Sequence, residues 1–263
     1  MKIPVLTVAG SDPSGGAGIQ ADLKALSANS VFAMSVLTSI TAQNSCGVTS
    51  VFHLPSHIID AQLEAIFSDI PVKTIKTGML ATPDIITTVS SRLAKQSIEH
   101  LVVDPVMVAK GGHTLLEEDG ISSLKSQLCP QAFLITPNIY EAEILSGMTI
   151  HTIAEARTAA KIIYQLGCRH VLIKGGHLKE QPGTDLLYDG RFFRMYKGEF
   201  IRTNNTHGTG CTLASAISAL LAKGQSLTNA IEAAKTYTTE AIRHGLTLGK
   251  GHGSTDHFYF LQA

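Results

Sequence analysis

The sequence predicts a doubly wound α/β/α sandwich, a three-layer fold with a mostly parallel central sheet. Segments with helical spacing alternate with short β-branched runs, which are typical of buried parallel strands. The runs lie at residues 3–9, 32–38, 74–77, 100–103, 132–135 and 170–173. This alternation favours a sheet covered by helices on both faces over an α+β fold.

The segments between the runs support this architecture. Residues 58–67 carry an apolar stripe at helical spacing, which indicates a helix packed on the sheet. Farther along, Thr152 and Glu155 predict a capping box at the start of a helix that ends near Gly167.

The last third of the chain changes character. Residues 185–203 are strand-like and contain two polar turns, which indicates a small antiparallel hairpin at one edge of the sheet. Two helices are predicted after it, at residues 209–222 and 227–244. No repeat or linker divides the chain, so we expect a single domain over residues 1–263.

Composition excludes several classes of protein. The 21 basic and 21 acidic residues balance, so we expect neither nucleic acid nor a membrane as partner. No apolar stretch approaches the roughly 20 residues of a membrane helix, and the first apolar run reaches glycine too early for a signal peptide. The four cysteines form no Cys-x-x-Cys pair, which favours a reducing compartment. We therefore expect a cytoplasmic protein.

Polar and glycine-rich residues follow the predicted strand ends, where ligands bind in open sheets of this kind. They lie at residues 10–18, 43–44, 76–79, 104–112, 136–141 and 174–177. We expect these loops to line one cleft. His113 and His177, in glycine-rich loops, either close over a ligand or are simply solvated.

The first glycine-rich loop, residues 10–18, follows a strand and opens a helix. Residues 16–21 match the dinucleotide fingerprint, but residues 36–43 contain no acidic side chain to bind a ribose. A nicotinamide site is therefore disfavoured, and the absence of a Gly-x4-Gly-Lys-Ser/Thr motif excludes a Walker A kinase. A plain flexible turn remains an alternative.

The second loop, residues 204–212, leads into a helix with an apolar face. Unpaired backbone N–H groups at a helix start can bind a phosphoryl group, and Gly208 and Gly210 allow its close approach. Cys211 falls in the first turn, where the helix field should favour its thiolate. It is either a nucleophile or base, or a small buried residue that packs the helix start.

Three further polar residues suit phosphoryl transfer, which needs positioning and charge neutralisation. Lys174, at a strand end, can neutralise nucleotide phosphates. Glu141 and Asp104 can hold Mg²⁺, directly or through water. Each residue has a plainer alternative, as a surface salt bridge or a helix cap.

Seven segments in order along the chain resemble hydroxymethylpyrimidine/phosphomethylpyrimidine kinases. They are GSDPSGGAGIQADL (10–23), TAQN (41–44), KTGM (76–79), DPVM (104–107), TPNIYE (136–141), KGG (174–176) and THGTGCT (206–212). The resemblance implies a ribokinase-like α/β/α sandwich and a homodimer. It also implies phosphorylation of 4-amino-5-hydroxymethyl-2-methylpyrimidine and of its monophosphate with ATP and Mg²⁺, for thiamine synthesis.

The resemblance also assigns roles to residues. Cys211 would accept the proton of the substrate hydroxymethyl group, and the backbone amides of Gly208, Thr209 and Gly210 would form the anion hole. Gln43 would pair with the aminopyrimidine edge, since its amide offers a donor and an acceptor. The other implied ligand contacts are Gly10, Asp22, Met79 and Val106 for the substrate, and Lys174 and Thr206 for the nucleotide.

Other functions stay open at this point. A pyridoxal or pyridoxine kinase of the same branch, or an enzyme that acts on both rings, is the nearest alternative. Gln43 favours the pyrimidine, because a hydroxypyridine lacks the amine partner. A silent sensor of thiamine precursors is disfavoured by the presence of Lys174, Glu141 and Cys211 together, and a nicotinamide-dependent oxidoreductase by the missing acidic residue.

Overall fold

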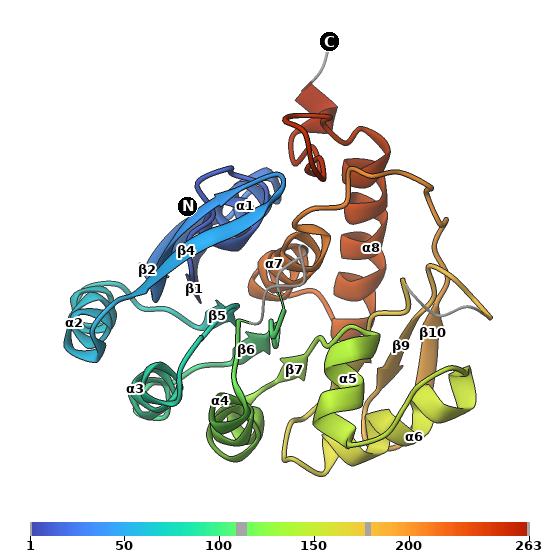
Figure 1. Cartoon of the computed structure of the whole chain (residues 1–263). Helices are drawn as coiled ribbons and strands as arrows, with labels where there is room; N and C mark the ends of the chain where they lie inside the picture. Colours follow the sequence, from blue (N-terminus) through green and yellow to red (C-terminus); the bar gives the residue numbers. More distant parts are fainter. Residues whose placement is uncertain (1, 109–114, 177–179, 262–263) are drawn as a thin grey trace.

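The computed structural model describes residues 2–108, 115–176 and 180–261, and within them the chain forms an eight-stranded sheet (Figure 1). Its strand order is β10-β9-β8-β7-β6-β5-β1-β2. The parallel strands are β1 (Pro4–Ala9), β2 (Phe32–Leu37), β5 (Thr74–Thr77), β6 (His100–Val103), β7 (Leu134–Ile135) and β8 (Val171–Ile173). The antiparallel edge is formed by β9 (Asp185–Tyr188) and β10 (Phe193–Tyr196). The predicted mostly parallel sheet with a small antiparallel edge is confirmed.

Helices cover both faces of the sheet. The helices are α1 (Gly18–Ala28), α2 (Ser56–Phe67), α3 (Pro83–Leu93), α4 (Glu118–Ser123), α5 (Ile139–Ser146), α6 (Ile153–Tyr164), α7 (Thr209–Ala222) and α8 (Leu227–Arg243). Side chains of α2 to α6 pack into one core, and those of α1, α7 and α8 pack on the opposite face. Neighbouring strand residues point to opposite faces, so Leu101 and Val103 lie in one core while Val102 lies in the other.

The local predictions for the second half of the chain hold with small shifts. Thr152 and Glu155 form a capping box at the start of α6, which ends at Tyr164, before Gly167. The hairpin of β9 and β10 turns over residues 189–192, where Gly190 has φ +90°. His113 and His177 lie outside the described residues.

A two-stranded sheet that the sequence did not predict stands beside the main one. It consists of β3 (Ser39–Asn44) and β4 (Gly47–His53) and is called the flap below. Its inner face includes Thr41 and Gln43, and its outer face exposes Ile40 and Phe52. The flap turn is held by the C-terminal segment, because the backbone N–H of His252 donates to the carbonyl of Ser45 at 2.9 Å.

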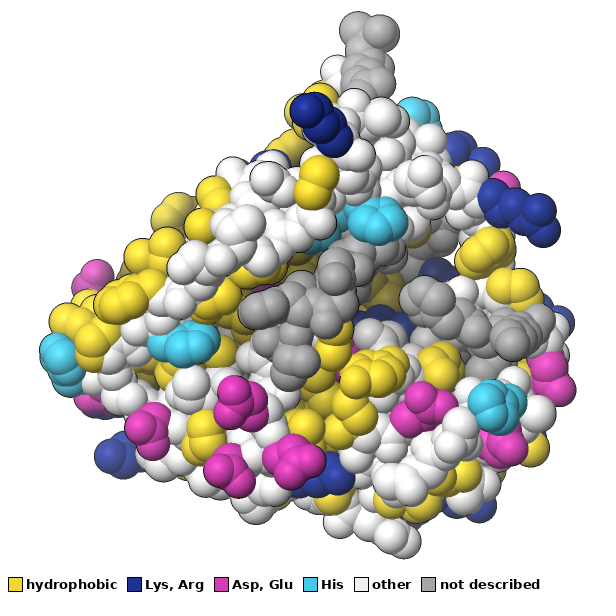
Figure 2. Space-filling model, in the orientation of Figure 1, with side chains coloured by type: hydrophobic (Ala, Val, Ile, Leu, Met, Phe, Trp, Pro, Cys, Tyr) yellow, Lys and Arg dark blue, Asp and Glu magenta, His cyan; other side chains and the backbone are white. Residues whose placement is uncertain are grey.

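The balanced overall charge is not spread evenly over the surface. Figure 2 shows mainly acidic side chains gathered over α3 and α4. No helix among the described residues has both the length and the apolar character needed to cross a membrane.

Candidate functional site

A cavity of about 610 Å³ lies at the carboxyl ends of the parallel strands, where the loops after β1, β5, β6 and β8 meet the flap and the start of α7. Most predicted site residues line it. They are Gly10, Gln43, Met79, Asp104, Val106, Glu141, Lys174, Thr206, Gly208, Thr209, Gly210 and Cys211. Asp22 is not among the residues that line the cavity.

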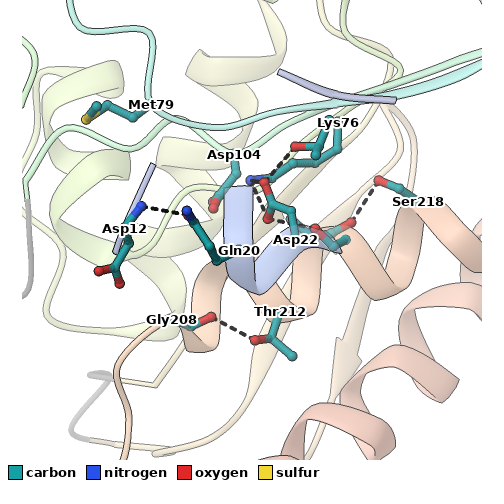
Figure 3. A network of polar contacts seen from close by, with 12 residues as sticks. Asp12, Gln20, Asp22, Lys76, Met79, Asp104, Gly208, Thr212 and Ser218 are labelled. Carbon is teal, nitrogen blue, oxygen red and sulfur yellow. Dashed lines mark hydrogen bonds and ion pairs between the residues drawn. The ribbon is translucent and has the colours of Figure 1, made fainter. Parts of the chain in front are cut away.

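Asp22 is instead buried, and its side chain pairs with that of Lys76 (Figure 3). Both carboxylate oxygens of Asp22 lie 2.9 Å from Lys76 Nζ, and neither side chain is exposed. The hydroxyls of Thr7 and Ser215 also donate to this carboxylate, at 2.6 and 2.8 Å. The expectation that Asp22 contacts substrate does not fit this geometry. Asp22 holds Lys76, which does line the cavity.

Lys76 is a cation at the floor of the cavity that sequence reasoning missed. Burial disfavours its charged form and is the largest single effect, but the charge of Asp22, the hydrogen bonds to it and the charge of Asp104 together outweigh burial, so the pKa of Lys76 lies above its usual range. Its position within the predicted loop 76–79 was the available signal. Nothing in the spacing of the chain linked it to Asp22, 54 residues away.

Cys211 lies in the first turn of α7, at the cavity wall. Burial raises the pKa of its thiol to about 12, and the carboxylates of Asp22 and Asp104 act in the same direction. The charge of Lys76 and a backbone hydrogen bond from Gly18 oppose this shift without overcoming it. The expectation that the helix start favours the thiolate is therefore wrong for this structure. The thiol is protonated at neutral pH.

The start of α7 packs closely on the loop after β1. Gly208, the residue before the helix, has φ +78°, and a Cβ added there would lie 1.7 Å from the carbonyl oxygen of Gly16. The Thr209 hydroxyl donates to the Thr206 carbonyl at 2.8 Å. No side chain of the described residues caps the first turn of this helix. The Thr209 N–H also donates to the Thr206 carbonyl, at 3.4 Å, and the partial positive charge of the helix start is suited to binding an anion.

Asp104, Glu141 and Lys174 form a charged cluster across the cavity. Lys174 Nζ lies 2.6 Å from Asp104 Oδ1 and 3.9 Å from Glu141 Oε2. Burial acts against the ionised carboxyl of Asp104, but Lys174 and Lys76 together hold its pKa below the usual value. Burial, with a contribution from Asp104, raises the pKa of Glu141 to about 7. A cation added beside Glu141 would favour its ionised form.

Glu141 is also a helix cap, which is one of the plainer roles that the sequence left open for it. It forms a capping box with Asn138 at the start of α5, with distances of 2.8 and 2.9 Å. The described residues contain no group of three or more His, Cys, Asp and Glu side chains that could hold a metal. The two carboxylates of Asp104 and Glu141 fit Mg²⁺, because this ion binds one or two protein carboxylates and completes its shell with water and phosphate oxygens.

Asp12 and His207 form a second buried pair that sequence reasoning missed. His207 Nε2 lies 2.7 Å from Asp12 Oδ2, and both residues line the cavity. His207 belongs to the predicted loop 204–212, but its partner is 195 residues away in sequence. Only the fold brings the two glycine-rich loops together.

Comparisons with known sequences point to one family. The family model described as phosphomethylpyrimidine kinase matches residues 12–256. The chain is 44% identical to the hydroxymethylpyrimidine/phosphomethylpyrimidine kinase of Bacillus subtilis, over 97% of this chain and 94% of that protein. It is 49% identical to a thiamine biosynthesis bifunctional protein of Geobacter sulfurreducens, over 96% of this chain but only 52% of that protein. The chain thus spans about half of that relative's length.

A similar solved structure is a pyridoxal kinase, the nearest alternative function named above. The ADP complex of Bacillus subtilis pyridoxal kinase superposes with a TM-score of 0.93 and 42% identity, covering 100% of both chains. Both acceptor rings therefore occur among proteins similar to this one.

Proposed function

The chain belongs to the phosphomethylpyrimidine kinase family, and on this premise we propose that it transfers the γ-phosphoryl group of ATP to 4-amino-5-hydroxymethyl-2-methylpyrimidine and then to the monophosphate. One observation carries the proposal. A single cavity brings the Gln43 amide together with Cys211 and the start of α7.

Substrate binding follows from the cavity lining. The Gln43 amide offers one donor and one acceptor, which match the ring nitrogen and the exocyclic amine of an aminopyrimidine. Gly10 allows the ring to approach the backbone, while Met79 and Val106 supply apolar contacts. The pyrimidine is then held at one end by polar groups and along its faces by apolar ones.

Charge neutralisation is the main task of the site during transfer. Lys174 and Thr206 contact the nucleotide phosphates, and the backbone amides of Gly208, Thr209 and Gly210 bind the transferred group. When bound, Mg²⁺ held by Asp104 and Glu141 would supply further positive charge.

Cys211 accepts the substrate proton late in the transfer. A thiol with a pKa of about 12 is not a pre-formed base. In a loose transition state the hydroxyl becomes strongly acidic only as the new P–O bond forms, so a late acceptor is sufficient. A thiol that still carries its own proton cannot accept a second one, so Cys211 first releases its proton to solvent. The Lys76 ammonium, whose charge favours the thiolate, stabilises the sulfur anion that then takes the substrate proton.

We further propose that the protein is a cytoplasmic homodimer. Its four cysteines are free, which suits a reducing compartment. Sedimentation analysis tests the dimer.

The test of function is an ADP-release assay with MgATP and three acceptors: the hydroxymethylpyrimidine, its monophosphate and pyridoxal. Turnover of both pyrimidines is expected. Turnover of pyridoxal alone would refute the pyrimidine assignment and leave the alternative, vitamin B6 salvage. A Gln43→Met variant should lose more activity on the pyrimidine than on pyridoxal, since only the pyrimidine uses both ends of the amide.

A further inference from the structure

The surroundings of the Gln43 amide fix which end of it is oxygen and which is nitrogen. The Oε1 position lies 3.3 Å from Thr41 Oγ1, and the Nε2 position lies 3.4 Å from His207 Nε2. The two ends of an amide are nearly identical in shape and are told apart by what their neighbours donate or accept. The hydrogen positions on Thr41 and His207 therefore decide the orientation.

Asp12 makes His207 a donor. The carboxylate of Asp12 accepts from the Ser14 backbone and hydroxyl and from the Ala17 backbone, at 2.9, 2.7 and 2.8 Å. Burial acts against ionisation, but His207 and these donors hold the pKa of Asp12 below its usual value. An ionised carboxylate only accepts. The 2.7 Å contact therefore requires a hydrogen on His207 Nε2, and that hydrogen is directed at Asp12. Toward Gln43 the same nitrogen then has no lone pair to accept from the amide nitrogen, and the partial positive charge of its N–H bond favours the amide oxygen there.

Thr41 is an acceptor toward Gln43. A threonine hydroxyl has one hydrogen to donate. The Thr41 hydroxyl donates it to the Ser11 carbonyl at 2.9 Å, a shorter contact than the 3.3 Å to Gln43. A lone pair is left facing the amide. The amide nitrogen therefore belongs beside Thr41, and the amide oxygen beside His207, which a half-turn of the terminal group achieves.

We propose that Asp12, acting through His207, and Thr41 fix the direction of the Gln43 amide, and with it the direction in which the pyrimidine lies in the cavity. This inference rests on the proposed function. Thr41 accepts one hydrogen of the amide, and the amide oxygen faces the N–H bond of His207. The free edge then offers a lone pair on the His207 side and a hydrogen on the Thr41 side, so the substrate amine lies toward His207 and the ring nitrogen toward Thr41.

This direction points the reactive group at the phosphoryl-transfer end of the cavity. In the substrate, the amine-bearing carbon lies between the ring nitrogen and the carbon that bears the hydroxymethyl group. The hydroxymethyl group is therefore on the His207 side. His207 directly precedes Gly208, the residue before α7, and Cys211 lies in the first turn of that helix. The opposite amide direction would turn the hydroxyl toward the flap.

The experiment compares the aminopyrimidine with its 4-oxo analogue, 5-hydroxymethyl-2-methylpyrimidin-4-one. The analogue has an acceptor in place of the amine and an N–H in place of the ring nitrogen, so both pairings with Gln43 fail unless the amide turns. Values of kcat/KM from ADP release and Kd from calorimetry are measured for both compounds. The wild type should prefer the aminopyrimidine by about 100-fold or more.

The variants His207→Leu and Thr41→Val each remove one constraint on the amide, from opposite ends. Each should reduce the preference to about 10-fold or less, because the freed amide turns to suit either ligand. His207→Gln retains an N–H and should restore most of the preference. His170→Leu, the same substitution at a histidine that binds the Phe133 carbonyl outside the cavity, should change nothing.

If the role of His207 were purely structural, His207→Leu would lower kcat/KM for both compounds by the same factor. An unchanged preference in this variant and in Thr41→Val would overturn the inference. A wild type that prefers the 4-oxo analogue would overturn it too. Failure of the proposed function looks different: the wild type would turn over neither compound, while calorimetry would still report which one binds. Binding of neither would refute both proposals.

Discussion

The close packing of Gly208 against Gly16 predicts that an alanine at position 208 separates activity from stability. An added Cβ would lie 1.7 Å from the Gly16 carbonyl oxygen, whereas real contacts of this kind stay above 3.0 Å. The loop must therefore move by 3.0 − 1.7 = 1.3 Å or more. A misplacement of about 1 Å costs roughly 100-fold in rate. We expect kcat/KM of Gly208→Ala to fall by about that factor or more.

Gly224 provides the matched control at the other end of α7. Its φ is +82°, close to the +78° of Gly208, but an added Cβ would have no atom within 4 Å. Gly224→Ala should lose about 1 kcal/mol of unfolding free energy, from left-handed strain alone, and keep its activity. Urea unfolding and the ADP-release assay measure the two effects. If Gly208→Ala retained more than a tenth of wild-type kcat/KM, the loop would be shown to yield freely and the argument would fail.

Three other substitutions test the charges of the site. Cys211→Ala should lower kcat about 100-fold or more, with ATP affinity retained. The pH profile of wild-type kcat should show no thiol ionisation between pH 6 and 9, and an ionisation near pH 8 would contradict the pKa of about 12. Lys76→Met leaves the buried Asp22 carboxylate unpaired and should cost about 3–5 kcal/mol in urea unfolding, most of it regained in the double variant with Asp22→Leu; no regain would argue against the pair. The pKa of Glu141 rises from 4.5 unfolded to about 7 folded, so its contribution to stability is full below pH 4.5 and is lost as pH rises to 7. Relative to Glu141→Gln, the unfolding free energy of the ligand-free wild type should fall over that range by roughly 3 kcal/mol, and parallel pH profiles would refute the shift.

The sheet was predictable because its strands are buried on both faces and read as apolar runs between helices. The flap was not predictable for the opposite reason. Ile40 and Phe52 point outward while Thr41 and Gln43 face the cavity, so polarity does not separate an inner from an outer face. A register shift between Ala42 and Gln43 disturbs the alternation further.

The candidate site was predictable as a set of loops but not as a set of contacts. Lys174, Glu141 and Cys211 stood out because each lies at a strand end or a helix start, where ligands bind. The pairs Lys76–Asp22 and His207–Asp12 join residues far apart in sequence, and one chain gives no spacing that links them. The pKa of Cys211 was misjudged because desolvation depends on packing, which sequence does not show.

The bonds from Gly251 and His252 to Ser45 have a consequence for biosynthesis. The flap turn is made early on the ribosome, but Gly251, which helps to hold it, is made 206 residues after Ser45. His207 and Cys211 are likewise synthesised long after Asp12 and Gln43. A nascent chain can therefore complete most of its strands while still having no place to bind substrate. Catalytic competence should arrive in one late step, when the C-terminal segment docks, and translation that stops before residue 251 should release a protein without a fixed flap.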